Sequence, residues 1–556
     1  PMAQAPGRRA TPAPRPSHRP AMAGLVAHGR AAPLLLALAA LPRGARACTA
    51  IAVGRDASAT GAPMVTHSDD SGPMTTDVRL VRVPRKQWPA GSKRPLYLWS
   101  IPYPRVVSAN VAPDYAPVRG QKESVPLGYI PQVAETWAYW DTDYGVQNEW
   151  GLSIGESTCT ANTVGWPAAP GQPWGYNKIG IEDLSKIAME RCKTARCAVQ
   201  TMGAVAVEQG FYSADSGLPT APAYGGSSEG LVIADAEPGE VWIFNVLTGR
   251  NNASAIWGAQ RVPPDHVVAV GNSFTIRRMN LSDHENFLYS PGVTELAEEK
   301  GWWSPAEAVA PGIFDFFGAY GYSPPEDDRN PGDLPNTRSV LSFYSGRRMW
   351  RIFSLLSPAE GARLDPEKGN LPRAAQPYPA SVPAPRGAVT PHMVMEVLRD
   401  HYEGTAYDLT KGLAAGPFGN PNRCPRPPGI AQVYGLWERG ISIQRGSWSH
   451  VLEPRPRGRS VAWLGYDAPH GTAYLPFFGA ATSTAPESFH SHEGYMAKFS
   501  TKAAWWAFNL ANQYADLNFA LINRHIRHKA LRLEAEAARR LRAWEAEAEE
   551  AEAAAA

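Results

Sequence analysis

The chain has 556 residues, of which 44% are hydrophobic, and its 54 basic and 52 acidic residues leave a formal net charge of +2. A charge this close to neutral, without a long basic stripe in the body of the chain, argues against a nucleic-acid-binding protein. No apolar run reaches the roughly 18 residues that a helix needs to cross a bilayer, so we expect no nucleic-acid partner and no stable membrane span.

The first part of the chain is predicted to be a leader that is removed. An apolar run rich in leucine and alanine spans residues 31–41, and Ala45 and Ala47 then form the small-x-small pattern that signal peptidase recognises. Cleavage after Ala47 would make Cys48 the first residue of the mature protein. We therefore expect a disordered leader and signal peptide over residues 1–47. We also expect a place in the secretory pathway, either extracellular or in a vacuolar or lysosomal lumen.

Cys48 would then carry two reactive groups, a thiol nucleophile and a free α-amine. An α-amine titrates at about pH 8, so it can accept the thiol proton and later return it to a leaving amine, as in N-terminal-nucleophile hydrolases. Two other interpretations stay open. Most cysteines in secreted chains are disulfide partners or small buried residues, and a lipidated cysteine would need leucine where this chain has Ala45.

The segment that begins at Cys48 is expected to form a hairpin. Residues 48–54 alternate as in a strand, turn residues follow, and residues 63–67 form the returning strand. This hairpin would return Asp70 beside Cys48, where its carboxylate would accept a hydrogen bond from the α-amine, with His67 as a polar residue lining the site. The ordinary alternative is that Asp70 is a turn residue.

Four further residues are candidates for the chemistry. Asn148 lies in a predicted turn between two strands, where its N–H would stabilise an oxyanion by about 3 kcal/mol; the alternative is an asparagine that a turn tolerates. Asn272 would orient substrate or cap a strand, and Arg348 or Arg351 would bind a carboxylate or lower the thiol pKa, unless both are surface residues of a helix. No residues have the spacing of metal ligands or of a phosphate-binding loop, so we expect no metal and no cofactor.

The other cysteines are Cys159, Cys192, Cys197 and Cys424. Apolar residues recur at helical spacing over residues 181–209, so we expect one helix there. Cys192 and Cys197 would lie on different faces of that helix, and we therefore do not expect them to pair with each other. The remaining pairings stay open from the sequence.

The remaining periodicities predict a mixed fold with loops over residues 160–178 and 213–229. Strands are predicted at 230–234, 241–246, 266–270, 440–443 and 460–464, and helices at 390–401 and 503–525. Strands and helices without βαβ alternation favour a layered α+β fold, here as one domain over residues 48–525. The charged Ala/Glu-rich residues 526–556 are expected to form a helical tail exposed to solvent, although a coiled coil stays open.

Short motifs in order along the predicted domain are similar to those of one family. They are residues 48–54, 66–70, 148–152, 155–158, 180–184, 259–263, 400–405, 407–412, 467–470 and 505–509. Together they resemble peptidase family C69, the dipeptidases related to secernins. The resemblance implies the four-layer αββα fold of N-terminal-nucleophile hydrolases, a cysteine nucleophile exposed by processing, and hydrolysis of dipeptides with broad side-chain tolerance.

Similarity to the wider bile-salt-hydrolase-like group implies roles for particular residues. Asp70 corresponds to the residue that anchors the amine and Asn148 to the oxyanion donor, and Asn272 and one of the two arginines named above are further site residues. That group has arginine at the position of His67. The resemblance therefore does not supply a fixed positive charge that activates the thiol from this position.

The favoured function is that of a cysteine dipeptidase. The free ammonium of a dipeptide would meet Glu149, Glu156 or Asp69, and its carboxylate would meet an arginine. An amidase for N-acyl or conjugated small molecules on the same fold is a second hypothesis, and a non-catalytic, secernin-like secretion factor is a third. Homo-oligomerisation stays open.

Overall fold

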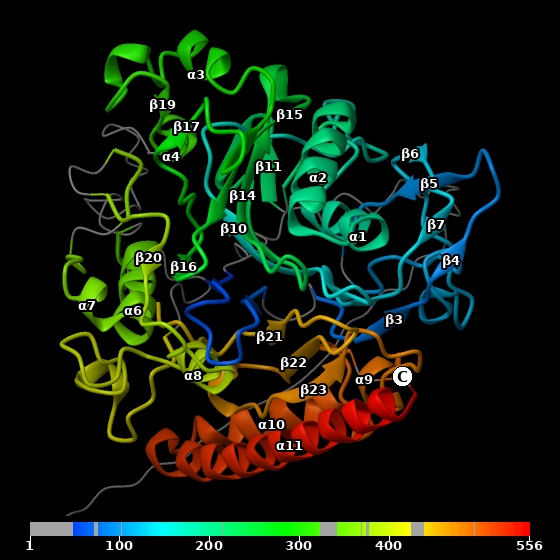
Figure 1. Ribbon diagram of the computed structural model, residues 1–556, viewed down its shortest axis with the longest axis vertical. Helices are drawn as coiled ribbons and strands as arrows, with labels where there is room; N and C mark the ends of the chain where they lie inside the picture. Colours follow the sequence, from blue (N-terminus) through cyan, green and yellow to red (C-terminus); the bar gives the residue numbers. More distant parts are fainter. Residues whose placement is uncertain are drawn as a thin grey trace, which may run out of the picture. The chain divides into compact units, whose positions relative to one another are not determined.

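The computed structural model describes residues 48–71, 76–99, 101, 103–213, 215–322, 342–367, 370–373, 377–423, 439–493 and 495–555. The predicted leader, residues 1–47, and Cys424 lie outside these ranges. Helices and antiparallel sheets are mixed along the described residues, in agreement with the predicted α+β class (Figure 1). None of the helices within these ranges combines the length and the hydropathy that a membrane span requires.

The sheet that contains β1 has seven strands within the described ranges, and each neighbouring pair is antiparallel. In spatial order they are β20 (Val382–Pro383), β16 (His266–Val270), β1 (Ala50–Val53), β2 (Met64–Asp69), β21 (Trp448–Glu453), β22 (Val461–Tyr466) and β23 (Leu475–Phe478). β1 and β2 form the predicted hairpin, with Ala52 opposite Val65 and a bridge between Thr49 and Ser68. The hairpin therefore brings Cys48 next to the end of β2.

A second antiparallel sheet has eight strands in the part of the chain that the structure describes. In spatial order they are β18 (Phe287–Tyr289), β15 (Ala255–Val262), β14 (Val241–Thr248), β13 (Ser228–Ala234), β10 (Ser153–Cys159), β9 (Gly145–Asn148), β8 (Tyr139–Asp141) and β3 (Val81–Val83). The turn predicted at Asn148 joins β9 to β10. β10 therefore lies in the interior of its sheet, as β1 does in the other.

The two sheets pack against each other, since β10 and β13 contact β1 and β2. The approach is closest at Gly155 of β10, where a Cβ atom would collide with the carbonyl oxygen of Thr66. Only glycine permits so close an approach between backbones. Alternate residues of β1 point to two different cores: Ala52 belongs to the core shared with the second sheet, and Ile51 to the core shared with α6 and α8. Both faces of β1 are thus buried.

Helices pack on both sheets. α1 (Ile181–Arg191) and α2 (Ala195–Gln209) contact the eight-stranded sheet. The seven-stranded sheet is contacted by α6 (Arg347–Leu356), α8 (Pro391–Leu398), α10 (Ala504–Ala515) and α11 (Phe519–Ala555). Figure 1 shows α10 and α11 lying side by side along β22 and β23. α6, the helix that carries both candidate arginines, is therefore packed against the sheet that contains β1.

Shorter elements occupy the connections. The short helices are α3 (Glu295–Glu299), α4 (Phe316–Tyr320), α7 (Pro358–Gly361) and α9 (Glu487–His490), and single helical turns are Pro113–Tyr115, Arg250–Asn252, Pro305–Glu307, Ser342–Gly346, Leu413–Ala415 and Pro469–Gly471. Two-stranded ribbons are formed by β4 (Lys86–Gln87) with β7 (Glu135–Thr136), β5 (Lys93–Leu96) with β6 (Gly128–Pro131), β11 (Asp215–Leu218) with β12 (Ala221–Gly226), and β17 (Met279–Asn280) with β19 (Ile313–Phe314).

The helix predicted over residues 181–209 is two helices, and the two cysteines at the break form a disulfide. Cys192 is extended after α1, and the side chain of Thr194 caps α2 by accepting a hydrogen bond from the Cys197 N–H at 3.3 Å. This break brings the Cα atoms of the two cysteines to 5.6 Å. The expectation that Cys192 and Cys197 do not pair was wrong, because it assumed an unbroken helix between them.

Other segments also differ from the predicted elements. Residues 440–443, predicted as a strand, are not in a strand, and the predicted loop over residues 213–229 contains β11 and β12. β15 and β21 were not predicted. β21 contains the buried polar residues Ser449 and His450, so its sequence shows no clear alternation; it is a strand because β2 and β22 supply hydrogen bonds on both sides.

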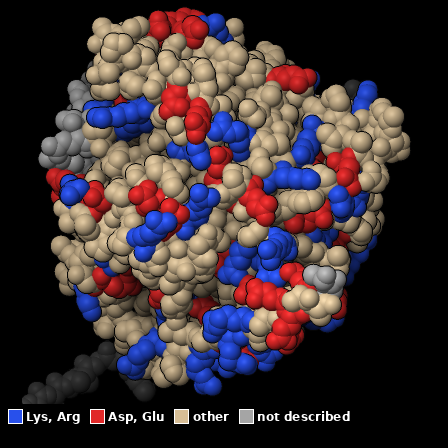
Figure 2. Space-filling model, in the orientation of Figure 1, with Lys and Arg blue, Asp and Glu red and all other residues tan. Residues whose placement is uncertain are grey.

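The C-terminal helix α11 runs without a break across the domain boundary predicted at residue 525. Its Glu534 and Leu541 are buried against the rest of the protein, and Glu534 forms an ion pair with Arg399. One stripe of the tail is therefore packed, whereas the sequence predicted an appendage exposed to solvent. Acidic and basic side chains are interspersed on the face shown in Figure 2, where α11 lies along the lower edge.

Candidate active site

Cys48 lies just before β1, where the two sheets meet, and it is fully buried. Its carbonyl oxygen accepts hydrogen bonds from Ser157 Oγ of β10 at 3.2 Å and from Arg348 Nη1 of α6 at 2.9 Å. Elements of the second sheet and of a helix on the first sheet therefore hold the main chain of this residue. The carbonyl group of Cys48 is therefore held from both sides.

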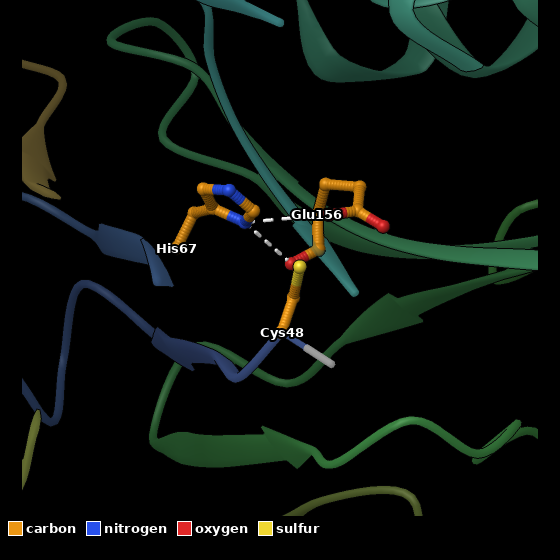
Figure 3. A group of neighbouring side chains, drawn as sticks. All are labelled: Cys48, His67 and Glu156. Carbon is orange, nitrogen blue, oxygen red and sulfur yellow. Dashed lines mark hydrogen bonds and ion pairs between the residues drawn. The ribbon is translucent and has the colours of Figure 1, made fainter. Parts of the chain in front are cut away.

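The side chains of Cys48, His67 and Glu156 converge (Figure 3). Cys48 Sγ, one imidazole nitrogen of His67 and one carboxylate oxygen of Glu156 lie within 4.8 Å of one another. His67 Nδ1 is 2.8 Å from the Glu156 carbonyl oxygen and 3.5 Å from Glu156 Oε2. Because a carbonyl oxygen only accepts, the ring proton is assigned to Nδ1. Nε2 has no hydrogen-bond partner among the described residues.

Burial raises the pKa of the Cys48 thiol well above its ordinary value. The negative charges of Glu156 and then Asp69 raise this pKa further, because they disfavour a thiolate beside them. While Ala47 remains attached, Cys48 has no α-ammonium that would oppose these effects. The thiol is therefore held protonated at neutral pH in the uncleaved chain.

We expect the thiolate of Cys48 in the uncleaved chain to form only at a pH above about 8.5, the ordinary value for cysteine. A raised pKa means that the proton stays bound to higher pH, so the ultraviolet absorbance of the thiolate should appear late in a titration. The signal of Cys48 is obtained by subtracting the titration of Cys48→Ala from that of the wild type. Glu156→Gln should move the transition to lower pH, since it removes a neighbouring negative charge. A Cys48 thiolate already present at neutral pH would contradict this assignment.

Asp70, at the end of β2, is completely buried and forms an ion pair with Arg439. Asp70 Oδ2 also accepts a hydrogen bond from Ser68 Oγ at 3.3 Å, and Ser68 Oγ accepts one from the Thr49 N–H at 3.1 Å. Asp70 Oδ1 has no hydrogen-bond partner in the described ranges. The carboxylate is therefore linked to the residue that follows Cys48 and keeps one oxygen for a further donor.

Arg348 joins Cys48 to the loop after β16 with all five of its N–H donors. The acceptors, at 2.5 to 3.0 Å, are the carbonyl oxygens of Tyr344, Cys48 and Gly271, Thr49 Oγ1 and Asn272 Oδ1. Asn272 has a φ of 62°, a conformation that asparagine tolerates better than most residues. Its Nδ2 donates one hydrogen to the Thr158 carbonyl oxygen at 2.7 Å. Arg348 fixes the orientation of this amide, and the orientation of the amide sets the direction of the second Nδ2 hydrogen.

Two predicted site residues are engaged elsewhere. Asn148 Nδ2 donates to the carbonyl oxygens of Met189 and Cys192, at 3.0 and 2.8 Å, so both amide hydrogens hold the end of α1. Both Nδ2 hydrogens of Asn148 are therefore engaged away from Cys48, and the structure provides no support for the oxyanion role expected for this residue. Arg351 donates to both carboxylate oxygens of Asp400, at 2.9 and 2.6 Å. Of the two candidate arginines, only Arg348 contacts Cys48.

The structure also brings two residues to the site that the sequence analysis did not select. Arg439 is buried, pairs with Asp70, and approaches Asn272 Oδ1 at 3.4 Å. It lies outside every recognised motif, so the sequence carries no signal for it. Glu229 is buried in β13, and its charge acts on Cys48. A charged residue at the edge of the apolar segment 230–234 was the available signal, but the predicted strand began one residue later.

The Cys48, His67 and Glu156 cluster also contains the sulfur, nitrogen and oxygen ligands that Zn²⁺ accepts. The sequence shows no metal-ligand spacing because the three residues come from separate strands or strand ends. A thiolate that ligates a metal is not at the same time a free nucleophile. Metal binding and nucleophilic attack are therefore exclusive uses of this cysteine, and an experiment can separate them.

Comparisons with known proteins point to one peptidase family and to proteins named as dipeptidases. The model of Peptidase family C69 matches residues 47–532. A protein named "Probable dipeptidase" from Salmonella dublin is 22% identical over 443 residues, covering 78% of this chain and 81% of its own length. A "Dipeptidase" from Bifidobacterium longum is 25% identical, with 79% and 72% of the two chains covered. "Dipeptidase A" of Lactobacillus helveticus is 22% identical, with 85% and 82% covered.

Proposed function

The chain belongs to peptidase family C69 and is a hydrolase, and on that premise we propose that it is a dipeptidase with Cys48 as its nucleophile. The observation that carries the proposal is the position of Cys48. It follows the predicted cleavage site directly, and its buried thiol lies within 4.8 Å of His67 and Glu156. The names of the relatives support dipeptides as the substrate class.

Cleavage after Ala47 would free the α-amine of Cys48. In the proposed first step this amine takes the thiol proton, and the sulfur attacks the carbonyl carbon of the first residue of the dipeptide, forming a C–S bond. The resulting ammonium protonates the leaving amino acid as the C–N bond breaks. Water then attacks the thioester with the amine as base, which releases the first amino acid and restores the thiol. We assign Asp70 Oδ1, which has no hydrogen-bond partner in the described ranges, as the acceptor for this ammonium.

The oxyanion formed during attack needs a donor close to the sulfur. We assign this role to Asn272, whose Nδ2 uses one hydrogen on the Thr158 carbonyl oxygen and has a second hydrogen. Its Oδ1 accepts hydrogen bonds from Arg348 and Arg439, so the amide is held in one orientation. Preorganised donors of this kind stabilise developing charge without a reorganisation cost.

The four-layer αββα arrangement of N-terminal-nucleophile hydrolases is part of the same proposal. Contacts between β1 and β13 and between β2 and β10 support the two inner layers. Contacts of α1 with β9 and of α6 with β16 support the outer layers. In such an arrangement the nucleophile sits at the start of a central strand, which is the position of Cys48 before β1.

The test is a substrate panel combined with intact mass. Purified protein is incubated with dipeptides and with N-acyl amino acids and conjugated amides, and the released amino acids are measured. We expect hydrolysis of several dipeptides, and we expect the active species to have the mass of a chain that begins at Cys48. Preferred release from N-acyl substrates would favour an amidase instead. Activity in a chain that still carries residues before Cys48 would contradict the proposed use of the α-amine.

Residues 1–47 lie outside the described residues. As part of the same proposal, we assign them as a leader that contains a signal peptide. We propose that the enzyme acts in the secretory pathway, in an extracellular or vacuole-like compartment. The support is the apolar run followed by Ala45 and Ala47. Expression with the native leader followed by fractionation tests this location, and recovery of the whole active pool in the cytosol would contradict it.

A further inference from the structure

Glu156 and Glu229 form a buried pair of carboxyl groups beside the nucleophile. In the register of β10 and β13, Thr158 is opposite Glu229, and Glu156 is two residues from Thr158 on the same face of the sheet. Both glutamates are essentially inaccessible to solvent. Burial, and then the neighbouring Glu156, raise the pKa of Glu229 well above its ordinary value. Two carboxyl groups are therefore held together in a place that disfavours two negative charges.

The pair lacks a basic side chain to neutralise it. In the described part of the chain neither glutamate forms an ion pair with lysine or arginine, and His67 Nδ1 lies 3.5 Å from Glu156 Oε2. Thr158 Oγ1 donates to Glu156 Oε1 at 3.0 Å, and Ser213 Oγ donates to Glu229 Oε1. Apart from each other, the second oxygens of the two carboxyl groups have no hydrogen-bond partner among these residues. The raised pKa keeps a proton on Glu229 that hydrogen-bonds to Glu156, so the pair carries one buried negative charge, which a bound cation would neutralise.

The distance to the sulfur indicates which cation fits. A carboxylate oxygen of Glu156 lies within 4.8 Å of Cys48 Sγ. In an amino-terminal residue the ammonium nitrogen is about 2.5 Å from the carbonyl carbon, because a single carbon separates them. The sulfur approaches that carbon at about 3 to 3.5 Å, and a carboxylate binds an ammonium at about 2.8 Å. These lengths allow Glu156 to bind the ammonium of the residue under attack, whereas an ammonium one residue farther along the chain lies about 3.8 Å farther from the carbonyl carbon.

The other carboxylates expected to bind the ammonium are already engaged. Glu149 Oε1 accepts a hydrogen bond from the Ala138 N–H at 2.9 Å in the turn before β10. Asp69 accepts hydrogen bonds from the Ser71 N–H at 3.1 Å on Oδ1 and from Thr76 Oγ1 at 3.0 Å on Oδ2. Asp70 Oδ1 is assigned above to the α-ammonium of Cys48 itself, so of the three carboxylates expected to meet the substrate ammonium, Glu156 is the one left available, with Glu229 beside it.

We propose that Glu156, supported by Glu229, binds the α-ammonium of the substrate and so restricts hydrolysis to the first peptide bond of an unblocked amino terminus. This inference rests on the proposed dipeptidase function and adds the group by which the substrate is selected. It separates the dipeptidase from an amidase on the same fold, because an N-acyl substrate would place a neutral amide against two carboxyl groups. The buried carboxylate would then have no ammonium to pair with, and an unpaired buried polar group is the usual reason why a site rejects an analogue strongly.

The first test uses the wild type alone, in its processed form. Alanyl-alanine is compared with propionyl-alanine, which lacks only the amino group, and with N-acetyl-alanyl-alanine. We expect kcat/KM for alanyl-alanine to exceed that for propionyl-alanine by about 100-fold or more, with N-acetyl-alanyl-alanine equally poor. Similar values for alanyl-alanine and propionyl-alanine would overturn the inference and leave the dipeptidase function intact. If no dipeptide is hydrolysed, the proposed function itself fails, and this inference fails with it.

The second test changes the carboxyl groups. Glu156→Gln should lower kcat/KM for alanyl-alanine by about 100-fold and for propionyl-alanine by less than about threefold, so that the preference for the free amine disappears. Glu229→Gln should reduce the same preference by about tenfold. Glu149→Gln, a matched change in the turn before β10, should leave the preference unaltered. A general loss of both activities in Glu156→Gln, with the preference kept, would indicate a structural role and overturn the inference.

A bound metal is the competing occupant, and the same proteins test it. Wild type is treated with EDTA, and Zn²⁺ binding is measured by calorimetry for wild type and Glu156→Gln. We expect EDTA to leave the preference for the free amine unchanged. Activity that is lost on EDTA treatment and restored by Zn²⁺, together with Zn²⁺ binding that Glu156→Gln abolishes, would make this carboxylate a metal ligand and overturn the inference.

Discussion

Replacing Cys48 by alanine is expected to lower kcat for dipeptide hydrolysis by about 10⁴-fold or more. The change removes the sulfur that we propose forms the bond to the substrate, and no other described thiol lies in the cluster with His67 and Glu156. Folding should be preserved, because the contacts that hold this residue come from its carbonyl oxygen. The measurement is release of amino acids from a dipeptide, with circular dichroism as the check on folding.

Two controls identify the sulfur as nucleophile. Cys159→Ala makes the same change at another buried free cysteine, so it should keep most of the activity. A slow substrate should leave a covalent acyl adduct on Cys48 that intact mass detects, and EDTA should not prevent its formation. Full activity in Cys48→Ala would contradict the proposal that Cys48 is the nucleophile. Loss of activity without any adduct, combined with inhibition by EDTA, would point to a metal-ligand role for this cysteine.

Arg348→Met is expected to cost about 3 to 5 kcal/mol of unfolding free energy and to reduce kcat by at least about 100-fold. The guanidinium is completely buried and donates five hydrogen bonds, among them one to the Cys48 carbonyl oxygen at 2.9 Å and one to Asn272 Oδ1 at 2.5 Å. Methionine has a similar length but donates none of these hydrogen bonds. Arg348→Lys should recover only part of the loss, because a lysine has three donors without the planar fork. Chemical denaturation and steady-state kinetics measure the two effects.

Arg351→Met is the matched control, since it is the same change one turn later in α6. Arg351 pairs with Asp400 on a partly exposed surface, so we expect a loss of stability of about 1 kcal/mol and a kcat within about threefold of the wild type. Equal effects of the two substitutions would contradict the assignment of Arg348 to the site.

Local sequence features were enough to locate several parts of the fold. The hairpin of β1 and β2, the turn between β9 and β10, and α8 follow from periodicity and from turn residues, whose causes lie within a few residues of chain. The break between α1 and α2 was missed because Cys192 and Lys193 do not prevent a helix by themselves. The helix ends there because Asn148, from a distant hairpin, binds the carbonyl oxygens of Met189 and Cys192.

Packing between the sheets decided which residues surround Cys48. Glu229 and Arg439 belong to no motif near Cys48, and they reach it only because β13 and the segment before β21 converge on β1 and β2. Packing also gave the two arginines of α6 different partners: Arg348 contacts Cys48, and Arg351 contacts Asp400.

The sequence by itself determined the family, the α+β class and the hairpin that Cys48 precedes, and it supplied the proposal that Cys48 is the nucleophile, because each depends on short stretches of chain. The tertiary structure alone decided the Cys192–Cys197 pairing, the engagement of Asn148 in the fold, and the acidic pair beside the thiol. The reason is physical. Hydrogen bonds and packing between residues distant in sequence decide which polar side chains already have partners and which remain free to bind a substrate.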